Sequence, residues 1–179
     1  TVKNPEVLAM VRKAGIKWLC LGIESGDKKV RLEVAKGKFE DVDVRKIVGQ
    51  VHEADIDVMA NYMYGLPGDD HETIKKTYEL SVELCTSGWN TYPTMALPGS
   101  ALYKEGISKG IEMPKSYSGY SFHAYDTICL PTDKLKSWEI LKLRDDAFIS
   151  YHLNFKFLER IKSRFGDKAV QNIKQMSKI

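Results

Sequence analysis

Residues 58–69, with the sequence VMANYMYGLPGD, decide the fold of this chain. An apolar run ends in a Gly-Leu-Pro-Gly turn and a charged segment follows, which predicts a buried parallel strand leading into a helix. The turn then lies at the C-terminal end of the strand, where α/β sheets place their ligand sites. Asn61 is the one amide in the run, and a buried amide needs hydrogen-bond partners. It is therefore either a satisfied core residue or part of a site.

Two further strands are expected, one before and one after this stretch. Residues 17–26, KWLCLGIESG, alternate between branched side chains and small or acidic ones: Leu19, Leu21 and Ile23 against Cys20, Gly22 and Glu24. In a parallel sheet the branched set meets the covering helices, and the set ending in Glu24 faces the other side or a barrel interior. Residues 89–97 predict a third strand, which Pro93 weakens toward an edge or a bulge.

Helices separate these strands at about the spacing of βα units. Asn4 and Pro5 begin the first helix and Gly15 ends it, by the usual capping preferences. The next expected helices are residues 27–36 closed by Gly37, one capped by Asp41 or Asp43, and one capped by Asp69 with Glu72 and ended by Gly88. Beyond residue 100 we expect a short helix at 102–110 and an ordered loop at 112–131. A helix should then run from Thr132 or Asp133 to about residue 153, before a basic helical tail. Its core side should be formed by Leu135, Trp138, Leu141 and Phe148.

Composition indicates one globular domain or a piece of a larger protein. The chain has 179 residues, 43% of them hydrophobic and 28% charged, with a net charge of +3. This charge is too small to argue for nucleic acid, and no apolar run approaches the ~20 residues of a membrane span. A signal peptide is also not evident. The sequence therefore favours neither nucleic acid nor membrane as a partner, and we expect a cytoplasmic protein.

The cysteines do not form a metal-binding motif. Cys20, Cys85 and Cys129 lie far apart, without the short spacing that holds zinc or an iron–sulfur cluster. An odd, scattered set fits a reducing cytosol better than a disulfide framework. We expect all three to serve as small apolar side chains in the core.

Two predicted strand ends carry the polar groups of a binding site. Glu24-Ser25-Gly26 and the turn at residues 65–68 would present a carboxylate, a hydroxyl and open backbone to one mouth. Such a mouth can hold an amino group, ribose hydroxyls and the edge of an adenine, since each needs a few directed hydrogen bonds within an apolar cleft.

Three motifs in order give the chain a family resemblance. LGIESG at residues 21–26, NYMYGLPGD at 61–69 and ALPGSALY at 96–103 resemble the second half of the barrel of radical S-adenosylmethionine (SAM) enzymes, closest to the cobalamin-binding type. The resemblance covers about residues 4–110, with 111–179 as a C-terminal extension. It implies an α/β fold with parallel strands, the second half of a partial (β/α) TIM-like barrel, plus a long loop and a helical extension.

The resemblance also implies which residues contact the cofactor: Glu24, Ser25, Asn61, Met63, Gly65, Met95 and Leu97. By analogy with the family, Glu24 and Ser25 help to hold the methionine part and the ribose of SAM. The strand at 61–65 passes the adenine and ribose, and the third strand gives backbone contact to the adenine at 95–97. A carboxylate at a strand mouth can pair with an ammonium or accept hydroxyl protons. The competing interpretation is that Glu24 only bonds neighbouring backbone or a lysine.

One departure from the family changes the expected activity. The C-x-x-x-C-x-x-C loop that holds the [4Fe–4S] cluster is missing, as is the glycine-rich segment for the SAM amino group. The parent protein would supply both upstream and would cleave SAM reductively to a 5′-deoxyadenosyl radical, whereas this chain alone would not. We therefore expect a fragment whose open strand edge needs its own N-terminal half, or another chain, to cover it.

The resemblance leaves the substrate and a cobalamin domain open. His123, Tyr120 and Tyr125 would line the substrate side of the mouth or, as the simpler alternative, pack within their loop. Two other functions compete. Glycine turns at strand ends also suit a phosphate-binding isomerase or an aldolase on a TIM-type barrel, although no lysine lies on the three predicted strands beyond Lys17 at the start of the first. A non-catalytic α/β module that binds a nucleotide or a partner protein is the third hypothesis.

Overall fold

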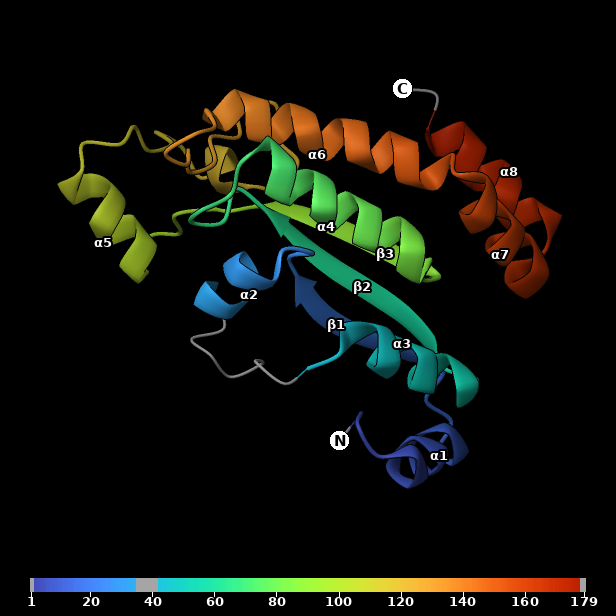
Figure 1. Ribbon diagram of the computed structural model, residues 1–179. Helices are drawn as coiled ribbons and strands as arrows, with labels where there is room; N and C mark the ends of the chain where they lie inside the picture. Colours follow the sequence, from blue (N-terminus) through green and yellow to red (C-terminus); the bar gives the residue numbers. More distant parts are fainter. Residues whose placement is uncertain (1, 35–41, 178–179) are drawn as a thin grey trace.

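The chain folds around a parallel sheet of three strands. The computed structural model describes residues 2–34 and 42–177. The expected helix end at Lys36 and Gly37, and the expected N-cap role of Asp41, therefore lie outside the described residues. Strands β1 (Trp18–Glu24), β2 (Asp57–Tyr64) and β3 (Gly88–Pro93) are hydrogen-bonded in that order, all parallel (Figure 1). The predicted α/β class and parallel strands are confirmed. In the described part of the chain the sheet does not close into a barrel, and its place in half a barrel stays a prediction.

Eight α-helices and one short 3-10 helix connect and cover the strands in the described part of the chain. Their bounds are α1 (Pro5–Lys13), α2 (Lys28–Val34), α3 (Val44–Glu53), α4 (His71–Leu84), α5 (Ala101–Ser108), η1 (Ser118–Tyr120), α6 (Ser137–His152), α7 (Phe155–Phe165) and α8 (Asp167–Met176). Helices α3, α4 and α6 lie on one side of the sheet, and α5 lies beyond the C-terminal end of β3 (Figure 1). None of the described helices is long and apolar enough to cross a bilayer.

Side-chain caps fix two helix starts where the sequence predicts them. The side-chain oxygen of Asn4 accepts a hydrogen bond from the backbone N–H of Glu6 at 2.8 Å, directly before Pro5. Asp43 accepts one from the backbone N–H of Lys46 at 3.1 Å. A cap satisfies N–H groups that have no partner within the helix. Helices α1 and α3 therefore begin at positions that local chemistry determines.

The predicted caps of α4 are wrong by one residue at its start. Asp70 and Thr73 form the capping box, with hydrogen bonds of 3.0 and 2.9 Å between each side chain and the other residue's backbone N–H. Asp69, expected in that role with Glu72, is instead buried and accepts the backbone N–H of Leu66 at 2.9 Å. Its carboxylate is used to close the glycine turn, so the helix starts one residue later.

The end of α4 also differs from the prediction. The helix stops at Leu84, and Cys85 takes a left-handed conformation with φ 45°. Gly88, expected to end the helix, is the first residue of β3. It pairs with Met59, and a Cβ at Gly88 would come within 2.5 Å of the Met59 side chain. A side chain at Gly88 would force the Met59 side chain to move, so glycine suits the close packing of the two strands.

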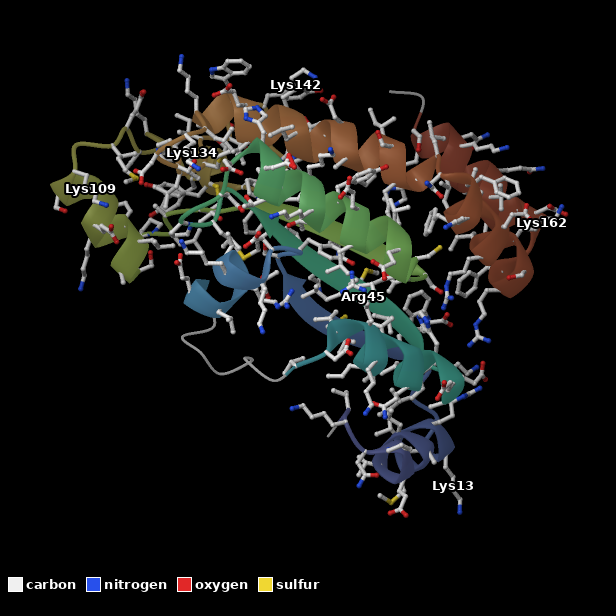
Figure 2. The ribbon with its side chains drawn as sticks, in the orientation of Figure 1. Lys13, Arg45, Lys109, Lys134, Lys142 and Lys162 are labelled. Atoms are coloured by element: carbon white, nitrogen blue, oxygen red, sulfur yellow. The ribbon has the colours of Figure 1, made fainter. Side chains whose placement is uncertain are left out.

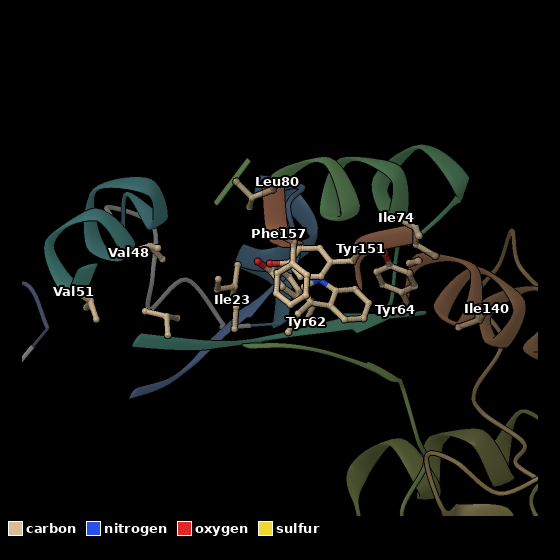
Figure 3. Close-up of a cluster of buried hydrophobic side chains, with 14 of the residues drawn as sticks. Ile23, Val48, Val51, Tyr62, Tyr64, Ile74, Leu80, Ile140, Tyr151 and Phe157 are labelled. Carbon is tan, nitrogen blue, oxygen red and sulfur yellow. The ribbon is translucent and has the colours of Figure 1, made fainter. Parts of the chain in front are cut away.

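The hydrophobic core lies between the sheet and the helices. The core side of β2 is formed by every second residue, and all four are fully buried: Val58, Ala60, Tyr62 and Tyr64. Figure 3 shows Ile23, Tyr62 and Tyr64 in one cluster with Val48 and Val51 of α3 and Ile74 and Leu80 of α4. Leu19 and Leu21 pack against the same cluster. The prediction that the branched face of β1 meets the helices is therefore confirmed.

Strand β3 ends earlier than expected, at Pro93. Proline has no N–H to continue the ladder. The backbone N–H of Thr94 still donates to the carbonyl of Tyr64 at 2.9 Å, but the Thr94 carbonyl accepts from Leu130 at 2.9 Å. Residues 95–97, expected as the end of the third strand, therefore follow it.

Helix α6 begins later than predicted, at Ser137. Thr132, an expected cap, accepts the backbone N–H of Leu135 at 3.0 Å and donates to the carbonyl of Asp69 at 2.9 Å, so it organises a turn before the helix. The buried side of α6 includes Ile140 and Tyr151, whereas Trp138, expected in the core, is 61% exposed. Leu135 is nevertheless buried in the turn before the helix, and Leu141 and Phe148 pack against the core as predicted, so the prediction is wrong for Trp138.

The C-terminal helices are attached to the N-terminal end of the sheet. Asp57, the buried first residue of β2, accepts hydrogen bonds from Arg164 of α7 at 2.9 Å and from Ser87 at 2.6 Å. Arg164 also bonds Asp55, which pairs with Arg12 of α1 at 2.6 Å. This network joins the first helix, the base of β2 and α7.

Cationic side chains are distributed over many elements. Figure 2 labels six of them, each on a different segment: Lys13, Arg45, Lys109, Lys134, Lys142 and Lys162. Arg45 contacts Glu83 at 2.5 Å, and Lys134 contacts Asp70 at 2.7 Å. Several of the described cations are thus paired with carboxylates and spread over the surface.

Candidate functional site

The sheet has an open face opposite the helices, and one row of side chains crosses it. Gly22 of β1 is in register with Asn61 of β2, which is in register with Asn90 of β3. Residues in register on parallel strands point to the same side, and the neighbours of these residues along each strand belong to the core side. The row therefore lies on the face that the helices leave open.

Glu24 places its carboxylate at one end of this row. The ladder between β1 and β2 shifts register between Gly22 and Glu24, and Glu24 has φ 64°, which is uncommon for a residue with a Cβ. A Cβ at Gly22 would lie 2.5 Å from Oε1 of Glu24. The carboxylate thus folds back over Gly22, and a side chain at this position would displace it.

The Glu24 carboxylate has no protein partner in the part of the chain that the structure describes. It makes neither a hydrogen bond nor an ion pair there, so the simpler interpretation, in which it bonds backbone or a lysine, is not what the described contacts show. Its burial raises the pKa of this carboxyl above the ordinary value. A half-buried acid with a perturbed pKa and accessible oxygens is typical of a functional group.

A cavity of about 340 Å³ runs along the outer edge of β1. Glu24 and Arg31 line it together with apolar residues of α3. Arg31 also donates to the carbonyl of Ser25 at 2.8 Å, which holds the strand end against α2. Sequence reasoning missed Arg31 because one arginine in a short charged helix looks like ordinary surface.

Ser25, predicted to present its hydroxyl to a ligand, is directed toward the helices. Its side chain is fully buried, with Oγ 3.3 Å from Oγ1 of Thr77 on α4. The same oxygen accepts the backbone N–H of Asp27 at 3.1 Å. In this structure Ser25 shapes the turn after β1, and its hydroxyl is engaged by protein groups.

Asn61 and Asn90 are joined by a hydrogen bond. Nδ2 of Asn90 donates to Oδ1 of Asn61 at 3.1 Å, and both side chains are half-buried. The sequence singled out Asn61 but not Asn90, although the amide in each strand could have suggested the pair. On the same face Met63 is in register with Tyr92, whose ring lies 5.0 Å from that of Phe122.

The predicted glycine turn follows β2. Gly65 has φ 78°, and a Cβ there would lie 2.8 Å from Ile140 of α6, so both conformation and packing require glycine. The turn borders a second cavity of about 210 Å³ that reaches Thr94 and α5. Gly65 thus shapes the strand end by its backbone.

The last two predicted contact residues lie apart from the open-face row. Met95 is buried in the hydrophobic core, and Leu97 is 47% exposed in the turn before α5. In the long loop His123 and Tyr125 are exposed, Tyr120 is half-buried, and Phe122 is the aromatic side chain that reaches Tyr92. The structure therefore brings together Glu24, Asn61 and Met63 on one face.

The cysteines are not grouped in the described structure. Cys129 is buried beside Ser137, Cys85 is half-buried, and Cys20 is exposed on the open face, so the expectation of a core role is wrong for Cys20. No group of three or more His, Cys, Asp or Glu residues that could hold a metal occurs within residues 2–34 and 42–177. The described side chains do not fit an iron–sulfur cluster.

Comparison with known proteins gives one distant relative. No protein-family model matches the chain. The anaerobic magnesium-protoporphyrin IX monomethyl ester cyclase of Cereibacter sphaeroides is 27% identical over 122 residues. The match covers 67% of this chain and 19% of the cyclase, so the chain corresponds to a small part of that enzyme. At this identity the similarity indicates a distant relationship to an enzyme.

Proposed function

We propose that this chain is part of a radical SAM enzyme and contributes the side of the site that binds the adenosyl and ribose groups of SAM. The parent would use a [4Fe–4S] cluster, held by cysteines outside this chain, to cleave SAM to a 5′-deoxyadenosyl radical. The open edge of β1 would be covered by the N-terminal half of the same protein. The chain alone binds the cofactor without cleaving it.

The observation that carries the proposal is the carboxylate of Glu24 on the open face, which has no partner among the described residues. It lies at the C-terminal end of a parallel strand, where α/β folds bind ligands. It needs a special backbone conformation and a glycine beneath it, so the carboxylate is specifically placed. Strained residues of this kind cluster at functional sites.

The described side chains fit the adenosyl part of SAM. A carboxylate accepts hydroxyl protons or pairs with an ammonium, and the amides of Asn61 and Asn90 add a second polar group in the same row. Met63 and Tyr92 offer an apolar surface above that row for a planar base. The residues of this chain therefore bind and orient the nucleoside.

The name of the relative is consistent with this proposal. The relative is an anaerobic cyclase that acts on a tetrapyrrole ester. A cyclase that works anaerobically does not use dioxygen as oxidant, and the organic radical supplied by SAM is one other means of removing hydrogen. The parent protein is therefore proposed to remove hydrogen from an organic substrate whose identity is open.

The phosphate-binding alternative is disfavoured by the helix starts next to the strand ends. The N-terminus of α4 is capped by Asp70, with Asp69 buried beside it. The N-terminal N–H groups of α2 are taken by Asp27, which accepts Lys29 at 3.0 Å. A phosphate at either helix would meet a carboxylate instead of free N–H groups.

Equilibrium dialysis of the purified chain with labelled SAM tests the proposal. We expect saturable binding at one site, and the substitution Glu24→Gln to weaken it by about tenfold, or ~1.4 kcal/mol. Glu79→Gln is the matched control, since Glu79 is an exposed glutamate on α4. Absence of binding, or equal affinity of the Glu24→Gln and unsubstituted chains, would overturn the proposal. Displacement by inorganic phosphate would favour the phosphate alternative.

A further inference from the structure

We propose that Asn90 is a positioning residue. It holds Asn61 so that the amide NH2 group of Asn61, and not its oxygen, faces a ribose hydroxyl next to Glu24. The inference rests on the proposed function, because it specifies how the same open face recognises the sugar.

The register of the three strands places the participating groups in one row. Gly22, Asn61 and Asn90 lie at the same level of β1, β2 and β3. Neighbouring strands are about 4.8 Å apart. The carboxylate of Glu24, which lies over Gly22, is thus about one strand spacing from Asn61. This separation suits two adjacent hydroxyls of one sugar.

The hydrogen bond between the two amides leaves the NH2 group of Asn61 free in this structure. Nδ2 of Asn90 donates to Oδ1 of Asn61 at 3.1 Å, so the Asn61 oxygen is engaged. An amide NH2 group has two donors. Nδ2 of Asn61 makes no hydrogen bond to any residue that the structure describes, and it is not among the enclosed polar atoms. A donor is therefore available beside the carboxylate.

The row then presents an acceptor and a donor side by side. One hydroxyl of a ribose can donate to Glu24 while the adjacent hydroxyl accepts from Asn61. If the Asn61 amide were reversed, two acceptors would face the sugar and both hydroxyls would have to donate. Asn90 thus acts through Asn61, and its removal leaves the Asn61 amide free to rotate.

Binding of three nucleosides to the purified chain tests this arrangement. Adenosine is compared with 2′-deoxyadenosine and 3′-deoxyadenosine by equilibrium dialysis. We expect the chain to prefer adenosine over each analogue by about tenfold, the value of one hydrogen bond. Asn90→Ala should reduce the preference against one analogue to about threefold or less, and Glu24→Gln should reduce the preference against the other. If Asn90 only maintained the fold, its substitution would lower the affinity for all three nucleosides by the same factor. The ratios between these affinities would then stay unchanged.

A double-mutant cycle tests whether Asn90 acts through Asn61. Asn61→Ala should abolish the preference for adenosine over the same analogue that Asn90→Ala affects. The two substitutions together should have no larger effect on this preference than Asn61→Ala alone. Asn90→Asp keeps the size of the side chain but lacks the NH2 donor, and it should behave like Asn90→Ala. Asn172→Ala, on the exposed side of α8, is the control.

The outcomes separate this inference from the function on which it rests. Additive effects of the two substitutions, or unchanged ratios in Asn90→Ala and Asn90→Asp, would overturn the role of Asn90 alone. If the unsubstituted chain binds neither SAM nor adenosine, the proposed function fails and the inference fails with it. Circular dichroism melting of each variant identifies any that do not fold, and Asn90→Asp then replaces Asn90→Ala.

Discussion

At the scale of single residues, Glu24 combines features that oppose stability. Its backbone is in the left-handed region, and its carboxyl is partly buried without a partner among the described residues. Neither feature helps the chain to fold, since each costs free energy. Proteins commonly keep such residues where binding requires them.

The raised pKa of Glu24 predicts how its substitution changes stability with pH. Because the folded-state pKa lies above the unfolded one, ionisation destabilises the folded chain as pH rises through these values. Glu24→Gln should therefore be more stable than the unsubstituted chain at pH 7, by less than about 1 kcal/mol because the group is half exposed. The difference should vanish below about pH 4, where the carboxyl is protonated in both states. Urea unfolding at pH 7 and at low pH measures it, and an equal difference at both pH values would contradict the prediction.

Gly22→Ala should displace the Glu24 carboxylate. The new Cβ would lie 2.5 Å from Oε1, closer than atoms pack, so the side chain must move. We expect the affinity for SAM to fall by about tenfold, as for the loss of one charged hydrogen bond. Gly49→Ala on α3 is the control, because nothing lies within 4 Å of a Cβ there. Unchanged affinity in Gly22→Ala would show that the ligand does not use the carboxylate in this position.

At the scale of secondary structure, most of the correct predictions came from the apolar alternation along strands and from helix N-caps. The apolar alternation of β1 and the Asn4 and Asp43 caps each depend on neighbours within a few residues, so the sequence alone reveals them. The errors occur where a distant contact decides. Asp69 closes a turn instead of capping α4, and Gly88 pairs with Met59 in the sheet instead of ending α4.

The candidate site was only partly predictable for the same reason. The strand ends and Glu24 follow from sequence patterns, but the partnership of Asn61 with Asn90 depends on the register between β2 and β3. The burial of Ser25 against Thr77 depends on how α4 packs. Such tertiary contacts leave no periodic trace in the sequence.

Helix α6 offers a direct test of its observed register. Ile140 is fully buried and contacts the glycine turn, whereas Trp138 is 61% exposed. Ile140→Ala should lower the free energy of unfolding by about 2–5 kcal/mol, and Trp138→Ala should change it by less than about 0.5 kcal/mol. Urea denaturation of the two variants distinguishes the observed helix from the predicted one, in which Trp138 belongs to the core. A larger effect of Trp138→Ala would favour the predicted register.

At the scale of the whole molecule, the two ends of the sheet carry different groups of residues. The C-terminal ends of the strands carry Glu24 and the glycine turn, and the N-terminal end holds the network of Asp57 with Arg164. The network joins segments far apart in sequence, so it ties the C-terminal helices to the base of the sheet.

Arg164→Ala should loosen this attachment without changing cofactor binding. It leaves the buried Asp57 with one charged hydrogen bond fewer, which we expect to cost about 1–3 kcal/mol. Amide hydrogen exchange should rise first in α7. Lys162→Ala is the control, since Lys162 pairs with the exposed Asp167. Equal exchange in α7 of the two variants would contradict the anchoring role.

The separation of these two ends has a consequence for engineering and for evolution. A strand of the length of β2 spans about 26 Å at ~3.3 Å per residue. Substitutions that strengthen or loosen the contacts of Arg164 are too distant to disturb the proposed nucleoside site directly. Thermal tolerance and ligand choice can therefore be adjusted independently in this chain, and a reporter dye carried by α8 can follow unfolding without obstructing ligand entry.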